Sequence, residues 1–212
     1  MRMRRKPNLD ARIERCAHLL VSNPAILRGR WLEEFNFDEL HIELGCGKGS
    51  FTVETAKRAP GTLLVGIEKV ENVIVIALER AQRENTENVR YICDLADDLT
   101  DFFAPGEVSR IYLNFSDPWP SRRHTKRRLT AESFLSSYKN VLRPGGEIHM
   151  KTDNLPLFKY SLSQFQNAGF TTLHETENLH KDGPVGIMTD YEKKFHNEGI
   201  LINMCVVRYE GT

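Results

Sequence analysis

The sequence predicts an α/β fold in which a mostly parallel, seven-stranded sheet carries helices on both faces. Short apolar runs alternate with segments of helical periodicity from about residue 40 onward. A glycine-rich turn or a polar residue closes most of these runs, as expected at strand ends in right-handed βαβ units. Because the chain has 212 residues, we expect one domain of this type over residues 39–212. A basic extension with a short helix should precede it over residues 1–38.

The first half of the chain contains three predicted strands. Residues 1–8 are basic, and the amphipathic spacing that follows predicts a short helix over residues 11–21. The apolar runs at residues 40–44, 63–67 and 89–93 predict strands. Helical spacing between these runs predicts helices over residues 50–58 and 70–85.

The second half continues the alternation and adds four strands. An apolar run predicts a strand over residues 110–115, and a basic loop at 121–128 leads into a helix over about residues 130–142. Pro144-Gly145-Gly146 predicts a turn before a strand at 147–151. A helix over residues 155–168 should end at Gly169, a favourable C-cap residue. The last two strands are expected at 170–174 and 200–208, with a long loop between them.

Composition limits the classes of protein to consider. The chain has 29 basic and 29 acidic residues, so any contact with nucleic acid must come from local clustering of charge. Its four cysteines are scattered without a CxxC pair, a pattern that suits neither a disulfide framework nor a zinc site. The longest aliphatic run, at residues 73–78, is too short to cross a bilayer. We therefore expect a cytoplasmic protein with no membrane segment and no metal.

A glycine loop follows the first predicted strand. Gly45, Gly47 and Gly49 open the next helix, where glycines let the backbone approach a ligand closely. The spacing is G-x-G-x-G, and Ser50 stands where a dinucleotide-binding loop has its third glycine, which disfavours NAD. Glu43 precedes the loop, and a carboxylate suits the cationic groups of S-adenosylmethionine (SAM) better than a pyrophosphate. A plain tight turn is the alternative interpretation.

Two further acidic residues close the next strands. Glu68 ends the second strand about twenty residues beyond the glycine loop, where a carboxylate can accept both hydroxyls of a ribose. Asp94 ends the third strand and is a candidate neighbour of an adenine ring. A solvated surface carboxylate is the alternative for each residue.

The segment Asn114-Phe-Ser-Asp-Pro-Trp-Pro120 follows the fourth strand. Its two prolines restrict the backbone and predict a rigid edge at the mouth of the sheet. There the ring of Trp119 can stack on a flat base, and the carboxylate of Asp117 can accept hydrogen bonds from a base edge. The alternative is a proline-rich connection in which Trp119 only fills the core.

A cluster of cations comes directly after this edge. Five cations within seven residues repel one another unless anions balance them, so phosphate contacts are favoured beside a base-sized aromatic ring. A solvated loop is the alternative, and Arg128 can instead pair with Glu132 on the following helix. The residues of the loop are Ser121, Arg122, Arg123, His124, Thr125, Lys126, Arg127 and Arg128.

From about residue 10 to the C-terminus, the chain resembles the bacterial tRNA (guanine-N7)-methyltransferases. The most specific markers are the Asn-Phe-x-Asp-Pro-Trp-Pro string and the His-x-Lys-Arg-Arg string that follows it. The other markers are Glu43-Leu-Gly-Cys-Gly-Lys-Gly49, Gly66-Ile-Glu68, Lys151-Thr-Asp153 and Thr189-Asp-Tyr-Glu192. The resemblance implies a Rossmann-like SAM-dependent methyltransferase fold over residues 39–212, SAM as cofactor, tRNA as partner, and a monomer or homodimer.

The resemblance also assigns roles to individual residues. It implies that Glu43, Glu68 and Asp117 contact SAM or its immediate site, and that Asp117 acts in catalysis. The adenine-side acidic position of the family falls at Leu95, beside Asp94. The chain has Ser121 where the family commonly has lysine, which leaves that substrate contact to Ser121 or Arg122. The residues implied to hold the target nucleoside are Asp153, Thr189, Asp190, Tyr191 and Glu192.

The chemistry implied is simple methyl transfer. Guanine N7 has an in-plane lone pair and no proton, so its reaction needs alignment more than a strong base. Carboxylates such as Asp117 and Asp153 would stabilise the positive charge that develops on the purine. Three alternatives are an NAD-dependent oxidoreductase, a SAM enzyme that methylates another RNA base, and a non-catalytic RNA-binding module.

Overall fold

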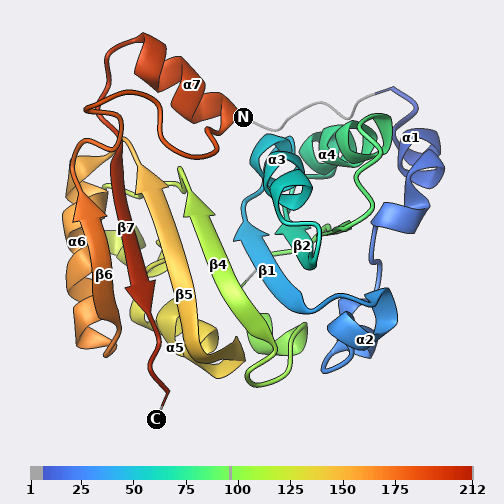
Figure 1. The fold of residues 1–212 in the computed structure, drawn as a ribbon, viewed down its shortest axis with the longest axis horizontal. Coiled ribbons are helices and arrows are strands. Elements are labelled where there is room, and N and C mark those ends of the chain that lie inside the picture. The colour runs from blue at the N-terminus through green and yellow to red at the C-terminus, as the bar shows by residue number, and fades with distance from the viewer. Residues whose placement is uncertain (1–6, 96, 212) are drawn as a thin grey trace.

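The computed structural model describes residues 7–95 and 97–211 and contains a seven-stranded sheet of order β3-β2-β1-β4-β5-β7-β6 (Figure 1). β1 to β5 run parallel to one another, whereas β7 is antiparallel to both β5 and β6. The predicted mostly parallel, seven-stranded sheet is therefore confirmed. The strands are β1 (Glu39–Leu44), β2 (Thr62–Ile67), β3 (Val89–Ile92), β4 (Val108–Asn114), β5 (Leu142–Thr152), β6 (Thr171–Thr176) and β7 (Asn203–Arg208).

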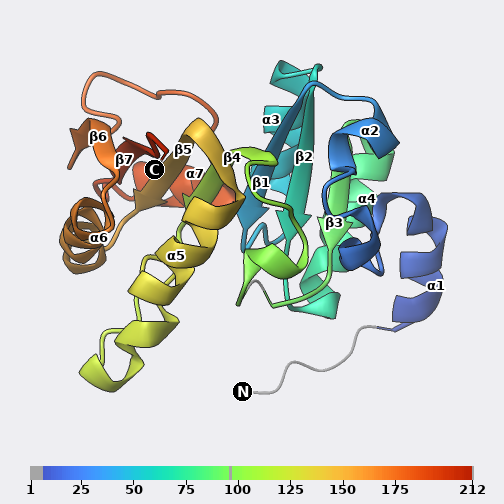
Figure 2. The ribbon, with the colours of Figure 1, turned by 90° about the horizontal axis from the view of Figure 1, so that it is seen from below.

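Helices cover both faces of the sheet, as predicted. α1, α3 and α4 lie on one face over the β1–β3 half, and α5 and α6 lie on the other face (Figures 1 and 2). The helices are α1 (Leu9–Arg15), α2 (Trp31–Phe35), α3 (Ser50–Arg58), α4 (Glu71–Arg83), α5 (Glu132–Val141), α6 (Leu155–Asn167) and α7 (Asp190–Asn197). Short 3-10 helices cover Ala17–Leu19, Pro24–Leu27, Leu99–Asp101 and Arg122–Arg127.

The N-terminal segment differs from the prediction of one helix over residues 11–21. α1 ends at Arg15, and a 3-10 turn follows before Leu20 bridges to Tyr91 of β3. The amide of Val21 donates to the carbonyl of Tyr91 at 2.8 Å, so the chain becomes extended and lies along the edge of the sheet. Residues 1–6 of the expected basic stretch lie outside the described residues, and the boundary at residue 38 stays a prediction.

Two of the α-helices in the described residues differ from the prediction, which had no helix at their positions. α2 has only five residues, too few for periodicity to reveal, and it is held by the buried Trp31, whose Nε1 donates to the carbonyl of Phe102 at 2.9 Å. α7 lies inside the segment expected to be a long loop, which was therefore wrong for residues 190–197. The last strand begins at Asn203 and not at residue 200, because the amide of Ile200 still caps α7 through the carbonyl of Phe195.

The other boundaries agree with the sequence within a few residues. α3 has the predicted bounds, and Gly169 follows α6 with a φ of 82°, as expected of a C-cap glycine. Residues 144–146, predicted as a turn, belong to the irregular start of β5, where the pairing with β4 shifts register. Among the residues described, no helix is long and apolar enough to cross a membrane.

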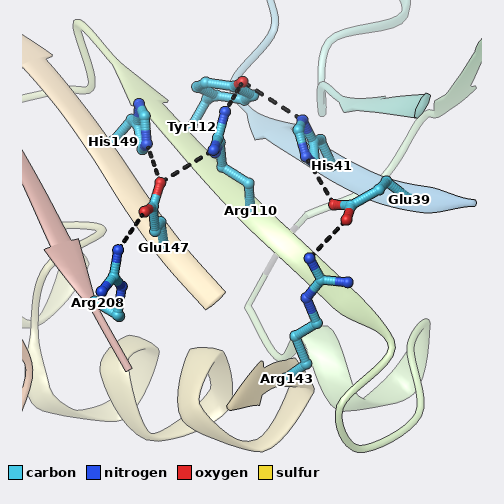
Figure 3. A network of polar contacts seen from close by, with 8 residues as sticks. All are labelled: Glu39, His41, Arg110, Tyr112, Arg143, Glu147, His149 and Arg208. Atoms are coloured by element: carbon cyan, nitrogen blue, oxygen red, sulfur yellow. Dashed lines mark hydrogen bonds and ion pairs between the residues drawn. The ribbon is translucent and has the colours of Figure 1, made fainter. Parts of the chain in front are cut away.

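The strands that carry the site have one apolar face and one polar face. On β1, β4, β5 and β7, alternate apolar side chains enter the core shared with α5 and α6. The opposite side chains, on the side of α3, form a connected network of ion pairs and hydrogen bonds across four strands (Figure 3). Its members are Glu39, His41, Arg110, Tyr112, Arg143, Glu147, His149 and Arg208.

Glu147 is the centre of this network. Its carboxylate accepts from Arg110 at 3.1 Å, from His149 at 2.8 Å and from Arg208 at 3.3 Å. Burial lowers the pKa of His41 to about 4, so this histidine is neutral at pH 7 and adds no charge to the face. Strands in a parallel sheet are usually apolar on both sides, so this face is unusual in being polar and internally paired.

Gly66 of β2 tests how closely the core cluster that contains Cys46 and Tyr91 is packed. A Cβ at Gly66 would lie 2.8 Å from the ring of Tyr91 and 2.9 Å from Sγ of Cys46. Gly66→Ala should therefore lower the free energy of unfolding by about 1–3 kcal/mol through overpacking. Gly61→Ala is the matched control, because its Cβ would meet only Asp38 at 3.7 Å. Equal urea midpoints for the two variants would contradict the packing.

Candidate active site at the carboxyl edge of the sheet

The carboxyl ends of β1, β2, β4 and β5 meet at one edge, because these strands are parallel and adjacent. The glycine loop, Glu68, the segment 115–120 and Asp153 follow these strand ends in turn. α7 lies beyond the same edge (Figure 1), with aromatic contacts to Phe115. Segments more than 100 residues apart thus converge, as the sequence predicted for the strand-end residues.

Glu43 is a buried carboxylate near the end of β1, with 3% of its surface exposed. Its Oε2 accepts from the hydroxyl of Thr52 at 2.5 Å, and its Oε1 accepts from the amide of Asn114 at 3.0 Å. Burial raises the pKa of Glu43 to about 7, although these two hydrogen bonds and the charge of Lys151 oppose the rise. A cationic ligand would stabilise the ionised form of such a carboxylate, because the ligand would supply the missing counter-charge.

The glycine loop is shaped for close approach by a ligand. Gly45, Gly47 and Gly49 have φ values of 72°, 57° and 70°, which only glycine adopts readily. A Cβ at Gly45 would meet nothing within 4 Å, and at Gly47 only a carbonyl at 3.9 Å, so this part of the loop faces open space. Gly49 instead packs against α4, where a Cβ would lie 2.7 Å from Ala77.

Glu68 lies directly beside this loop. Its Oε2 accepts from the amide of Gly47 at 3.3 Å, and its Oε1 accepts from the amide of Val70 at 3.0 Å. The half-buried carboxylate therefore contacts the glycine loop and the start of α4 together. The adenine-side candidates are more exposed: Asp94 accepts from the amide of Leu95 at 2.6 Å, and the side chain of Leu95 is 52% exposed.

The turn after β4 is strained. Phe115 and Trp119 have φ values of 52° and 39°, in a region that bulky side chains avoid. Conformations of this kind cost on the order of 1–3 kcal/mol each and persist where surrounding contacts enforce them. The amide of Phe115 donates to the carbonyl of Lys151 at 2.9 Å, which ties the turn to β5. Asp117, between the two strained residues, is exposed.

Arg128 holds the other end of this turn. Its guanidinium donates to the carbonyls of Pro118 at 3.0 Å and Trp119 at 3.1 Å, and it lies 4.3 Å from the ring centre of Tyr160. Arg128 therefore neither pairs with Glu132 nor points freely to solvent, and its contacts are those of a clamp on the turn. Sequence reasoning could not find this role, because the acceptors are main-chain oxygens nine and ten residues away.

The rest of the basic loop is a 3-10 helix whose cations are available to an anion. His124 and Arg127 flank the ring of Trp119 at 5.8 Å and 5.0 Å. Within residues 7–95 and 97–211, no carboxylate lies within 4.0 Å of a cationic group of this helix. The exposed members of the loop are Ser121, Arg122, Arg123, Lys126 and Arg127.

α7 presents an aromatic surface beside the edge. Tyr191 is 65% exposed, and its ring centre lies 6.4 Å from that of Phe195 and 6.5 Å from that of Phe115. Asp190 pairs with Arg80 of α4 at 3.4 Å. Asp153 is exposed at the end of β5. Tyr191, Asp153 and Asp117 are thus accessible, as a nucleoside contact requires.

The two remaining nucleoside candidates are buried. Thr189 caps α7 through a reciprocal capping box with Glu192, which has no exposed surface. Glu192 also contacts Lys151 and His180. From the sequence, Lys151 is named only within a family marker, and His180 is not named. A lysine two residues before Asp153 in a strand was a readable signal, whereas His180 lies in an irregular segment that offers none.

A cavity of about 280 Å³ lies below this edge on the polar face of the sheet. Asn114 and Lys151 form part of its lining, so it borders both Glu43 and Glu192. Its other lining residues come from α3, β4, β5, β7 and the segment before α7: Phe51, Thr55, Arg58, Tyr112, His149, Leu179, Val185, Gly186, Ile187 and Met204. Among the described residues, no group of three or more His, Cys, Asp or Glu side chains is arranged to hold a metal ion.

Comparisons with known proteins place this geometry in context. The model of a family described as "Putative methyltransferase" matches residues 38–204. Among solved structures, the 16S rRNA methyltransferase KamB superposes with a TM-score of 0.66 at 14% identity, over 84% of this chain and 92% of that chain. A SAM-dependent methyltransferase from Aquifex aeolicus superposes with a TM-score of 0.58 at 14% identity, over 96% and 99%.

A third similar structure is that of geranyl diphosphate methyltransferase in complex with GPP and sinefungin. It superposes with a TM-score of 0.55 at 14% identity, over 80% of this chain and 70% of that chain. At such identities the likeness concerns the fold, and it confirms the predicted Rossmann-like SAM-dependent methyltransferase fold.

Burial of Glu43 predicts a pH dependence of stability without ligand. Its pKa is about 7 in the folded chain, against an ordinary value of 4.5. Between these values the unfolded chain releases a proton that the folded chain keeps, so stability falls as pH rises from about 4.5 to 7. A difference of this size amounts to about 3 kcal/mol, and Glu43→Gln should remove it.

The measurement is the melting temperature of wild type and variant between pH 5 and 8. Glu43→Gln should gain stability relative to wild type as pH rises, whereas Glu54→Gln, at a half-exposed position on α3, should track wild type. Parallel curves for wild type and Glu43→Gln would mean that Glu43 is ionised throughout.

Proposed function

Because the chain belongs to the tRNA (guanine-N7)-methyltransferase family, we propose that the carboxyl edge of its sheet holds the cofactor and the target guanine side by side. The protein is a SAM-dependent enzyme of tRNA modification. The assignment of the edge rests on Glu43, a buried carboxylate whose charge is not fully compensated. It lies between the open glycine loop and the strained turn that bears Asp117.

The cofactor half of the edge comprises the ends of β1, β2 and β3. Glu43 would face the ammonium group of SAM, the amides of the open glycine loop would approach its methionine part, and Glu68 would accept its ribose hydroxyls. The exposed side chain of Leu95 offers an apolar surface for adenine, with Asp94 beside it. When bound, SAM supplies a methyl carbon made electrophilic by its positively charged sulfur.

The guanine half comprises the ends of β4 and β5 with α7. Asp117 and Asp153 would accept hydrogen bonds from N1–H and the 2-amino group, and the exposed ring of Tyr191 would stack on the purine. Positive charge develops on the purine as N7 is alkylated, and the two carboxylates would stabilise it. N7 carries no proton, so these residues orient the base and need not remove a proton from it.

The tRNA backbone would lie along the basic loop. We propose that Arg122, Arg123, Lys126 and Arg127 contact phosphates, with Ser121 or Arg122 in place of the family's usual lysine. His124, beside Trp119, would contact the target base. Arg128 would hold the turn through its hydrogen bond to the carbonyl of Pro118. We propose that the enzyme is a monomer or homodimer that acts in the cytoplasm, where its tRNA substrate lies.

The test of the function is nucleoside analysis of unmodified tRNA incubated with the protein and methyl-labelled SAM. We expect the label in 7-methylguanosine. Label in another base would instead indicate a methyltransferase of different specificity, and tRNA binding without any label would indicate a non-catalytic module.

Asp117→Asn should separate catalysis from binding. Replacing the carboxylate by an amide removes the charge that stabilises the purine cation and should lower the single-turnover rate of methyl transfer by about 100-fold. The dissociation constants for tRNA and SAM should change by less than about threefold, because most binding contacts lie elsewhere. Asp101→Asn, at an exposed position of the 3-10 turn Leu99–Asp101, is the control. Unaltered turnover by Asp117→Asn would remove Asp117 from the mechanism.

The basic loop should govern the salt dependence of tRNA binding. Changing Arg122, Arg123, Lys126 and Arg127 to glutamine should flatten the slope of log affinity against log salt by about 0.7–0.9 per lost phosphate contact, or about three in total. SAM affinity should stay constant. Arg30→Gln with Arg83→Gln serves as a control on exposed cations elsewhere. If the fourfold variant kept the wild-type slope, the loop would be a solvated surface.

A further inference from the structure

We propose that Lys151, Glu192 and His180 are positioning residues that fix α7 against the end of β5 and so place Tyr191 over the turn bearing Asp117. The proposal rests on the proposed function, since it concerns how the guanine half of the edge is assembled. From the sequence, Glu192 is expected to contact the nucleoside directly. We infer instead that Glu192 acts through the position of α7.

The hydrogen bonds of Glu192 exclude a direct contact in this conformation. Oε1 accepts from Lys151 at 2.9 Å and from His180 at 2.9 Å, and Oε2 accepts from Lys151 at 3.0 Å and from the amide of Thr189 at 3.2 Å. A carboxylate has about four lone-pair positions, so these four contacts use them all. With no exposed surface either, Glu192 has nothing left to offer a guanine edge.

Lys151 joins three parts of the guanine half. Its ammonium donates to Glu192 on α7 and to the carbonyl of Ile187, at 2.9 Å, in the segment before α7. Its own carbonyl accepts from the amide of Phe115 at 2.9 Å, which holds the strained turn. Asp153 follows two residues later, directly after the end of the strand. Lys151 therefore fixes the positions of the turn, the strand end and α7 relative to one another.

His180 completes the cluster from the loop after β6. Its Nδ1 accepts from the amide of Val185 at 3.1 Å, which leaves the proton on Nε2 to be donated to Glu192. The ring also packs edge-on against His196 of α7, with 5.1 Å between ring centres. The segment before α7 and the helix itself are thus attached to the same buried carboxylate.

The consequence of this arrangement is aromatic alignment. Tyr191 is adjacent to Glu192 on α7, and its ring lies next to those of Phe115 and Phe195. If Glu192 loses its partners, α7 keeps its capping box but loses its attachment to β5. A displacement of about 1 Å in a group that aligns reactants can cost about 100-fold in rate. The loss should therefore appear in the rate of methyl transfer more than in cofactor affinity.

The experiment compares Lys151→Met, Glu192→Gln and the double variant with wild type. Single-turnover methyl transfer, SAM affinity and amide hydrogen exchange are measured on each. We expect each single variant to lose about 10- to 100-fold in rate with SAM affinity within about threefold. Exchange should accelerate at the amides of residues 187–197 and stay unchanged in β1–β4. The double variant should be no slower than the slower single variant, because all three variants disrupt the same contact between Lys151 and Glu192.

Two controls keep the test decisive. Glu198→Gln removes an exposed carboxylate that pairs with Lys194 on the same helix and should leave rate and exchange as in wild type. His180→Gln retains a donor toward Glu192 and should lose less of the methyl-transfer rate. It is the conservative variant to use if Lys151→Met folds poorly.

Two results would overturn the proposal. A slower Glu192→Gln with unchanged exchange at residues 187–197 would indicate a direct contact with the base. Lower melting temperatures with an unchanged rate for the folded fraction would indicate a purely structural cluster. Absence of 7-methylguanosine with wild type would refute the proposed function instead, while the exchange measurements would still report whether the cluster holds α7.

Discussion

The parallel pairing of β1, β2, β4 and β5 determines where the residues of the candidate site lie. Parallel strands need crossovers, and the crossovers return every strand to the same starting side, so their carboxyl ends share one edge. Glu43 and Asp153 are brought to that edge although 110 positions separate them in the sequence. A carboxylate as buried as Glu43 would be costly elsewhere, and here it leaves a deficit of positive charge where a cationic cofactor is needed.

The other half of the edge depends on β5. The polar face of β4, β5 and β7 is internally paired up to His149 (Figure 3). Beyond it, Lys151 at the end of β5 pairs with Glu192 of α7. The same residue holds Phe115 in a conformation that its side chain would avoid. Lys151 therefore contacts both the strained turn and the buried Glu192, which links the position of Asp117 to the position of Tyr191.

Local signals in the sequence were sufficient for the sheet, the glycine loop and α3, because periodicity and glycine placement are properties of neighbouring residues. Partners distant in sequence were not predictable. The role of Arg128 depends on carbonyls of a turn whose shape only the fold reveals, and His180 gains its role from Glu192. α7 was missed although Thr189 and Glu192 have capping-box spacing, since the segment around it is polar and irregular.

The claim that one sheet edge holds both the cofactor and the guanine can be tested directly by chemical-shift mapping. Uniformly ¹⁵N-labelled protein would be titrated with SAM and then with guanosine 5′-monophosphate. We expect SAM to shift amides of the glycine loop, Glu68 and Leu95, and the nucleotide then to shift amides of residues 115–119, Asp153 and Tyr191. Nucleotide-induced shifts confined to the cavity beside α3, with the edge unchanged, would contradict this claim.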